Sequence, residues 1–283
     1  MQLKTYETAD RYLTDNLKWL EQKEVLNSLL LGLALDNAKN KRNGSFYLSI
    51  WKDNEIQFSG MQTPGRHLIM SSNDLNQEES ILTLADYLDR ERITFPGLLG
   101  AKNLVLHAGD TLASKLGWRY EVVYKQLVYQ LTAVKHNPPR NGHLRKATPE
   151  DLELVAKWMH QFLIEALNEN DEQAAREGAL RKINNEEVYL WMDGAAVTMT
   201  CIARPTNNGI TINYVYTPLE YRKKGYATKI VAELSSLMLG RGYQFCTLFT
   251  DMENPTSNDI YKRIGYEVVG EFRSIAFLDY SAS

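Results

Sequence analysis

The stretch from Ile210 to Thr228, ITINYVYTPLEYRKKGYAT, constrains the fold of this chain more than any other. Its first half predicts a strand, because β-branched and aromatic residues alternate with polar ones. The strand should end before Pro218, since proline cannot donate to a sheet ladder. After Gly225 the period becomes that of an amphipathic helix, with apolar residues at Ala227, Ile230, Val231, Leu234, Leu237 and Met238. The stretch therefore predicts a strand, a sharp turn and a helix.

The turn between this strand and helix, Arg222-Lys223-Lys224-Gly225, is rich in cations and contains a glycine. A helix N-terminus presents unpaired backbone N–H groups and the positive end of the helix dipole, so it attracts phosphate-like anions. Gly225 lets the backbone approach an anion closely, and the small Ala227 leaves room beside it. The turn is therefore a candidate diphosphate site. It is neither a P-loop nor a dinucleotide fingerprint, because the GxxxxGK[ST] and GxGxxG patterns are absent from it.

The composition indicates a globular protein of two ordinary domains, since the 283 residues are 44% hydrophobic and 24% charged. The net charge of −3 is spread along the chain, which argues against a nucleic-acid-binding surface. The sequence lacks a bilayer-spanning apolar run and a signal-peptide pattern, so we expect no membrane partner and a cytoplasmic location. Cys201 and Cys246 lie in apolar runs that predict buried packing. The five histidines lack metal-ligand spacing, so we expect no metal site.

The first half predicts the order helix, strand, strand, strand, helix, short strand, helix, strand. The predicted helices cover residues 10–40 with a break near 21–24, 77–92 and 102–116; the clearer strands cover 46–51, 56–61, 67–71 and 120–131, and 96–100 reads as a loop or turn. Two prolines and a glycine within 136–142 predict a linker, because they stop both helix and sheet. We therefore expect one domain over residues 1–135 and another over 143–283.

The second half predicts the same element order, counted from its first helix. This suggests an ancient tandem duplication and one α/β (α+β) fold class for both halves. The halves differ where the first should have its own version of the cationic turn. There, residues 73–79 read NDLNQEE, which is acidic and lacks glycine. Such a turn would repel a diphosphate, so only the second half should bind one.

Two motifs of the second half resemble those of the GNAT acyl-CoA N-acyltransferases. The R-x-x-G-x-A spacing at Arg222–Ala227 is similar to their diphosphate-binding motif, and the longer VYTPLEYRKKGYAT resembles the glycine N-acyltransferase-like branch. In the segment Asn254–Tyr266, NPTSNDIYKRIGY, Asn254 and Gly265 predict the N-cap and the end of a helix. This segment resembles the family's second motif. The resemblance covers roughly residues 144–277. It implies two tandem GNAT-like domains, each a mostly antiparallel mixed sheet flanked by helices, with the N-terminal one degenerate. It also implies an acetyl-CoA-dependent N-acetyltransferase.

The resemblance also implies roles for individual residues. Val215, Tyr216 and Thr217 would pair with the pantetheine arm and thioester of acetyl-CoA, and Asn254 would contact the arm from the other side. The diphosphate would be held by the segment Arg222, Lys223, Lys224, Gly225, Tyr226, Ala227 and Thr228. Tyr261 stands at the family's general-acid position, where a phenol of pKa about 10 is protonated at neutral pH and can deliver a proton to the leaving thiolate.

The sequence leaves the general base open. No acid lies between Ile210 and Thr217, which leaves Glu187, Glu220 or, as we prefer, a relay through water. The acidic link 165–172, between the first two helices of the second half, either attracts a cationic amine or is a solvated loop. The expected reaction is direct acetyl transfer, in a ternary complex, to a primary amine of a small molecule, amino acid or protein.

The sequence leaves two further questions open: whether the protein is an enzyme, and what the first domain does. The alternative to an enzyme is a non-catalytic module that binds or senses acyl-CoA. The first domain either closes one wall of the amine pocket or makes an oligomer contact such as that of a homodimer.

Overall fold

The computed structural model describes residues 1–73, 77–135 and 142–278, and the chain divides into two compact units. Unit 1 comprises residues 1–128, 250–253 and the chain from 269 onward; unit 2 comprises residues 129–249 and 254–268. These bounds do not coincide with one cut at 136–142, because β6 (Tyr120–Leu131) and β12 (Glu267–Phe277) each run through both units. Residues 136–141 of the predicted linker lie outside the described residues, so the linker stays a prediction.

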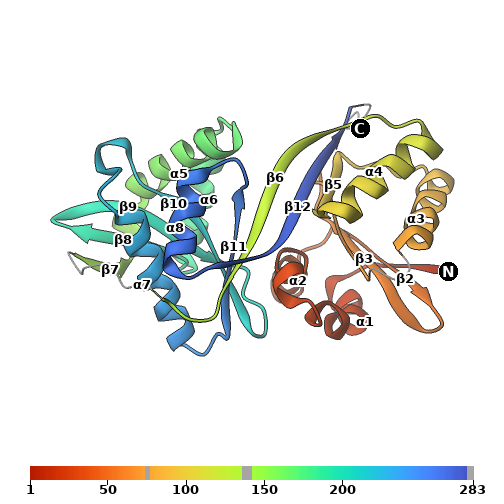
Figure 1. Ribbon diagram of the computed structural model, residues 1–283, viewed down its shortest axis with the longest axis horizontal. Helices are drawn as coiled ribbons and strands as arrows, with labels where there is room; N and C mark the ends of the chain where they lie inside the picture. Colours follow the sequence, from red (N-terminus) through yellow and green to blue (C-terminus); the bar gives the residue numbers. More distant parts are fainter. Residues whose placement is uncertain (74–76, 136–141, 279–283) are drawn as a thin grey trace. The chain divides into compact units, whose positions relative to one another are not determined.

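Unit 1 contains a sheet of strand order β1-β2-β3-β4-β5-β12 (Figure 1). Strands β4 and β5 are parallel, and the other neighbours are antiparallel. The elements are β1 (Gln2–Tyr6), α1 (Ala9–Glu21), α2 (Glu24–Lys39), β2 (Phe46–Lys52), β3 (Glu55–Gln62), β4 (Leu68–Ser72), α3 (Gln77–Glu91), β5 (Gly97–Ala101) and α4 (Lys102–Leu116).

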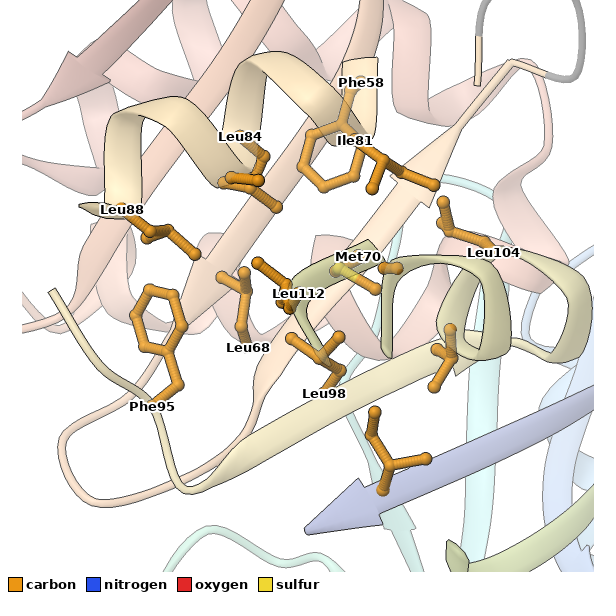
Figure 2. Close-up of a cluster of buried hydrophobic side chains, with 14 of the residues drawn as sticks. Phe58, Leu68, Met70, Ile81, Leu84, Leu88, Phe95, Leu98, Leu104 and Leu112 are labelled. Atoms are coloured by element: carbon orange, nitrogen blue, oxygen red, sulfur yellow. The ribbon is translucent and has the colours of Figure 1, made fainter. Parts of the chain in front are cut away.

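Helices cover both faces of the unit 1 sheet, as strand alternation requires. Leu48 and Ile50 of β2 point to the face covered by α3 and α4, whereas Tyr47 points to the face covered by α1 and α2. Figure 2 shows the first of these cores, in which leucines of α3 and α4 converge on Phe58 and Leu68. Each fully buried side chain of this kind stabilises the fold by about 1.5–3 kcal/mol relative to an exposed one.

Unit 2 contains a sheet in which the end of β6 is followed by β11, β10, β9, β8 and β7. Strands β10 and β11 are parallel, and the pairs from β10 to β7 are antiparallel. The elements are β7 (His143–Lys146), α5 (Leu152–Leu167), α6 (Glu172–Asn184), β8 (Val188–Asp193), β9 (Ala195–Ala203), β10 (Gly209–Tyr216), α7 (Tyr226–Gly240), β11 (Phe245–Asp251) and α8 (Pro255–Ile264).

A hydrophobic core fills the face of this sheet that α5 and α6 cover. Met199 and Cys201 of β9 point into it, together with Val155 and Met159 of α5. Helices α7 and α8 pack against each other over the other face (Figure 1). The short α8 is bounded by the residues that the sequence predicts: the Asn254 side chain caps its start, and Gly265 ends it with φ of 117°.

The repeated element order is confirmed, and it extends further than the sequence predicts. In each unit an edge strand, two helices and three antiparallel strands precede a helix, a strand that pairs in parallel, and another helix. The strand that follows the last helix of each unit pairs in the sheet of the other unit. Strand β12 follows α8 of unit 2 and pairs with β5 in unit 1, and β6 follows α4 of unit 1 and ends beside β11 in unit 2.

Two elements of unit 1 correct the sequence analysis. The edge strand β1 was not predicted. The loop or turn predicted over 96–100 is wrong, because residues 97–100 form most of β5, the short strand that the predicted element order has between α3 and α4. Its glycines serve close backbone approach: a Cβ on Gly97 would lie 1.9 Å from the Ile275 carbonyl oxygen, and one on Gly100 would lie 2.7 Å from that of Met70.

Candidate active site in unit 2

The turn before α7 presents an open helix N-terminus. Gly225 occupies the N-cap position with φ of 77°, and no side chain caps the helix. The first intrahelical bond runs from the Lys229 N–H to the Gly225 carbonyl at 3.1 Å, so the N–H groups of Tyr226, Ala227 and Thr228 precede the helical ladder. A Cβ on Gly225 would have no atom within 4 Å. The backbone is therefore accessible to an anion at this point.

The three cationic side chains of the turn differ in their exposure and in their hydrogen-bond partners. Lys223 and Lys224 are exposed, and the Lys224 Nζ donates to the Glu220 carbonyl at 3.2 Å. Arg222 turns back along the chain: its Nε donates to the Thr217 carbonyl at 2.8 Å, and its Nη2 pairs with a Glu165 carboxylate oxygen at 2.6 Å. The Tyr226 hydroxyl donates to Asp193 at 2.6 Å. The positive charge of the turn is thus only partly committed within the protein.

Strand β10 is bulged immediately before this turn. Asn213 pairs with Cys201 and Tyr216 with Met199, so two residues of β10 face a single residue of β9. Tyr214, one of the two, has φ of 50°, and its ring stacks on Phe162 of α5 at 5.0 Å. The bulge corrects the regular alternation predicted from Ile210 to Tyr216, because it moves Tyr214 and Tyr216 onto the α5 and α6 face.

Strands β10 and β11 part beyond their first residues. Their parallel pairing comprises three pairs, Gly209 with Phe245 to Thr211 with Thr247, although β10 continues to Tyr216. The strands therefore form a fork whose open end lies toward the turn before α7. Buried next to it, the Thr211 Oγ1 and Asn213 Oδ1 have no hydrogen-bond partner in the described part of the chain. A fork exposes backbone groups that a second strand would otherwise satisfy.

The three residues predicted to meet the acyl-CoA arm lie at the end of β10, with Thr217 directly after the strand. The Thr198 hydroxyl donates to the Tyr216 carbonyl at 2.7 Å and lies 2.8 Å from the Thr217 hydroxyl. Val215 is half-buried. The Tyr216 side chain is buried toward α5, where its hydroxyl contacts Gln161 at 3.1 Å and Glu165 at 3.3 Å. The structure therefore places these residues at the fork and links one of them to α5.

Helix α8 positions the other two predicted residues. The Asn254 Oδ1 caps the helix by accepting from the Ser257 N–H at 3.0 Å, and Asn254 is otherwise exposed. Tyr261 is 8% exposed and lies between the rings of Tyr129 and Tyr266, with both centroids 6.0 Å away. Its hydroxyl has no hydrogen-bond partner among the described residues. Burial raises the pKa of Tyr261, so the hydroxyl stays protonated throughout the neutral range.

The acids considered as bases have other roles in the structure. Glu187 pairs with Lys182 at 2.8 Å and accepts from Asn185, and Glu220 is exposed in a short 3₁₀ turn. Glu165, predicted to lie in the acidic link 165–172, instead belongs to the last turn of α5 and contacts both Arg222 and Tyr216. Its position four residues after Gln161, on one helix face, is the one sequence signal that relates it to a site.

Outside this region, the described residues form a cavity in unit 1 but no metal site and no membrane-spanning helix. A cavity of about 400 Å³ lies within unit 1, between β4, β5 and α2, and its lining includes Lys23, Ser71 and Lys102.

Among the described residues no cluster of histidine, cysteine and carboxylate side chains could hold a metal ion. Within the same residues, no helix is long and apolar enough to cross a membrane. Cys201 and Cys246 are buried, and burial raises the pKa of each thiol to about 12.

Comparison with known proteins identifies this architecture. The family model described as FR47-like protein matches residues 194–274, which include the bulged strand, the turn and α8. No curated protein sequence matches the chain. A GNAT-family acetyltransferase from Colwellia psychrerythraea is similar over 98% of this chain and 99% of its own, with a TM-score of 0.61 and 14% identity.

Two further solved structures match the whole chain. A Drosophila protein is similar over 99% of both chains, with a TM-score of 0.70 and 12% identity. A tandem GNAT protein from the clavulanic acid biosynthesis pathway covers 99% of this chain and 100% of its own, with a TM-score of 0.58 and 9% identity. The fold is a tandem GNAT fold. At these identities the likeness concerns the fold, and the chemistry must be argued from the residues.

Proposed function

We propose that unit 2 is an acyltransferase, an acetyl-CoA-dependent N-acetyltransferase that uses a primary amine of a small molecule, amino acid or protein as acceptor. The observation that carries this proposal is the uncapped N-terminus of α7 behind Gly225, directly after a bulged strand that parts from its parallel neighbour. The FR47-like match to the same segment supports it. The glycine N-acyltransferase-like branch and the cytoplasmic location stay predictions.

The residues present fit a diphosphate-bearing acyl carrier. The turn offers three N–H groups, an open glycine and two exposed lysines in one place. Arg222 to Thr228 would hold the diphosphate, and the fork at Val215, Tyr216 and Thr217 would receive the extended arm. Asn254 lies at the start of α8, and its Oδ1 is engaged as a cap, so only its Nδ2 is left as a donor to the arm.

Tyr261 is the group that we assign to proton delivery. When bound, acetyl-CoA supplies a thioester: the amine nitrogen forms a bond to the acyl carbon, the carbon–sulfur bond breaks, and the sulfur takes up a proton. Tyr261 would provide that proton from a hydroxyl that no described residue engages. Its elevated pKa keeps the donor form populated.

Removal of a proton from the acceptor amine needs no dedicated carboxylate in this proposal. Glu187 is paired and Glu220 is exposed, so neither has the isolated position expected of a base. Water at the fork would carry the amine proton to solvent, and Tyr261 would regain a proton from solvent after each transfer. Most of the rate would come from positioning the two reactants. The rate should therefore rise with pH as the acceptor loses its own proton.

A thiol-release assay over an amine panel tests the proposal. Purified protein, acetyl-CoA and each of ethanolamine, putrescine, lysine and glycine should give amine-dependent release of CoA with at least one amine. Mass spectrometry should show one added acetyl group on that amine. CoA binding without release above hydrolysis for every amine would instead favour the binding or sensing module, and no CoA binding would refute both.

A further inference from the structure

Glu165 connects the diphosphate turn to the buried end of β10. One carboxylate oxygen pairs with the Arg222 Nη2 at 2.6 Å, and the other accepts from the Tyr216 hydroxyl at 3.3 Å. The Arg222 guanidinium also lies 5.7 Å from the centre of the Tyr216 ring. Three side chains from α5, β10 and the turn thus form one small network. This network includes the first cation of the segment that, in the proposed function, holds a diphosphate.

The pairing of Arg222 with Glu165 is open to exchange. The side chains are 37% and 44% exposed, and ion pairs of that exposure contribute little net free energy. A diphosphate carries more charge than one carboxylate and matches the guanidinium fork at least as well. The Nε bond from Arg222 to the Thr217 carbonyl holds the base of the guanidinium close to the turn. Arg222 can therefore change its anionic partner without leaving the loop.

Release of Arg222 would leave the Glu165 carboxylate without its cation at the end of α5, beside the acidic link to α6. Glu165 would retain the Tyr216 hydroxyl, which in turn also contacts Gln161. The last turn of α5 precedes the link to α6, and this link contains Glu169 and Asp171. A carboxylate that has lost its cation at this place attracts another cation, and the substrate that carries one is the ammonium form of an amine.

We propose that Glu165 is shared between the two substrates: Arg222 occupies it in the free protein, the diphosphate of acyl-CoA displaces it, and the acceptor ammonium group then binds it. This inference rests on the proposed function and adds a specificity-determining residue to it. Glu165 opposes acyl-CoA binding and favours amine binding. It therefore gives a positive coupling between the two substrates, and such coupling is reciprocal.

The substitution Glu165→Gln should change the affinities for CoA and for the amine in opposite directions. Gln keeps the size of the side chain and a hydrogen bond to Tyr216 but loses the charge. We expect calorimetry to show CoA binding tightened about two- to fivefold, the range of an exposed ion pair. We expect the KM of the best amine to rise about tenfold or more, since a hydrogen-bonded charge is lost, with kcat changed little. The coupling between CoA and the amine should disappear.

The matched control is Glu153→Gln on the same helix. Glu153 is exposed and pairs with Arg176 at 2.5 Å, but it does not contact the turn. Its replacement should change neither CoA affinity nor the amine KM. In an Arg222→Ala background, Glu165→Gln should no longer alter CoA affinity, because the competing contact is already gone.

Several outcomes would overturn the inference. Weaker CoA binding by Glu165→Gln would mean that Glu165 prepares Arg222 for the diphosphate rather than competing with it. Unchanged CoA binding and amine KM would mean that Glu165 is a surface charge. Either result, with CoA binding by the wild type intact, leaves the proposed function standing. If the wild type does not bind CoA, both fail together.

Discussion

The two units have the same strand order but differ in the charge of the helix start that follows β4 in unit 1 and β10 in unit 2. In unit 2 the turn leads through Gly225 into α7, which has no acid in its first turn. In unit 1 the corresponding helix α3 begins with Gln77, Glu78 and Glu79. The Glu79 carboxylate pairs with Lys52 at 2.7 Å and with the N-terminal amino group at 3.8 Å. Each unit thus has a helix N-terminus at this place, and we expect the charge of its first residues to decide whether it can accept a phosphate. Residues 74–76 of the predicted acidic turn lie outside the described residues.

The strands before the two turns differ as well. Strand β4 pairs with β3 in an unbroken register from Met61–Ile69 to Phe58–Ser72, whereas β10 is bulged against β9. A bulge re-aims the side chains that follow it and interrupts the ladder. The cavity of unit 1 lies beside β4 and β5, and Lys102, which lines it, pairs with Glu271 at 3.1 Å. A neutralised cation is a weaker anion site than the exposed lysines of unit 2.

Two glycines of equal geometry give the largest expected difference between the units. Gly225 and Gly65 have φ of 77° and 70°, and a Cβ on either would meet no atom within 4 Å. Valine at either position should cost similar backbone strain, about 1–2 kcal/mol. Gly225→Val should also fill the space over the α7 N-terminus and reduce CoA affinity by roughly two orders of magnitude, about 2.7 kcal/mol. Gly65→Val should leave CoA affinity unchanged.

Isothermal calorimetry with CoA measures both variants, and their melting temperatures control for folding. The wild type and Gly65→Val should each bind one CoA per chain. A second CoA per chain would show that the acidic turn of unit 1 does not exclude the ligand. Equal losses of CoA affinity in both variants would mean that destabilisation of the chain causes the effect.

Two buried tyrosines give the next largest effect. Tyr12 of unit 1 is fully buried and its hydroxyl lies 2.6 Å from the Ser59 hydroxyl, whereas the hydroxyl of Tyr261 has no partner among the described residues. Tyr12→Phe should lower the free energy of unfolding by about 1–2 kcal/mol and leave kcat unchanged. Tyr261→Phe should barely change stability and should lower kcat about 100-fold, the range for a general acid.

Denaturant titration and steady-state kinetics on the same preparations check this pair. CoA affinity should be the same in both variants, because neither residue belongs to the diphosphate turn. A wild-type kcat in Tyr261→Phe would show that Tyr261 is not the proton donor.

The sequence predicts most helices and strands of both units, and the failures have identifiable physical causes. Strand β1 is short, and four of its five residues are exposed or half-exposed, so it lacks an alternating apolar pattern. In β5 the residues Gly97 and Gly100 read as turn formers, yet they are glycines because neighbouring backbones pass within contact of them. The exchange of β6 and β12 is invisible in the sequence, since either strand satisfies the same alternation.

The site was only partly predictable for a similar reason. The segment 222–228 and the cap at Asn254 are local features, and the sequence places both correctly on their elements. The bulge at Tyr214 depends on how β10 meets β9. The role of Glu165 depends on contacts with Tyr216 and Arg222, which are 51 and 57 residues away in the sequence. Contacts at such separations are set by tertiary packing, and the residue pattern of a single sequence does not reveal them.

The smallest expected difference between the units concerns their stability in acid. Asp151 of unit 2 completes a capping box with Thr148 and receives both guanidinium N–H groups of Arg145, at 2.7 and 2.8 Å. Asp15 of unit 1 pairs with Lys4 at 2.5 Å. The Arg145 hydrogen bonds lower the pKa of Asp151, and that of Lys4 lowers the pKa of Asp15. A carboxylate with a depressed native pKa stabilises the fold above its unfolded pKa, near 3.9, and loses this contribution as the pH falls through the native value.

Replacing each aspartate by asparagine should therefore matter at neutral pH and much less near pH 2. We expect Asp151→Asn to lower the free energy of unfolding of unit 2 by about 1–2 kcal/mol at pH 7, because a cap and a bidentate ion pair are lost together. Asp15→Asn should cost less, because a half-exposed lysine is a weaker partner. Both cysteines belong to unit 2 and are buried, so pulsed thiol labelling in a denaturant series reports the opening of that unit alone. Circular dichroism on the same samples reports both units. If Asp15→Asn shifted the thiol-labelling transition as much as Asp151→Asn did, the two units would unfold as one, and the comparison between them would concern chemistry but not stability.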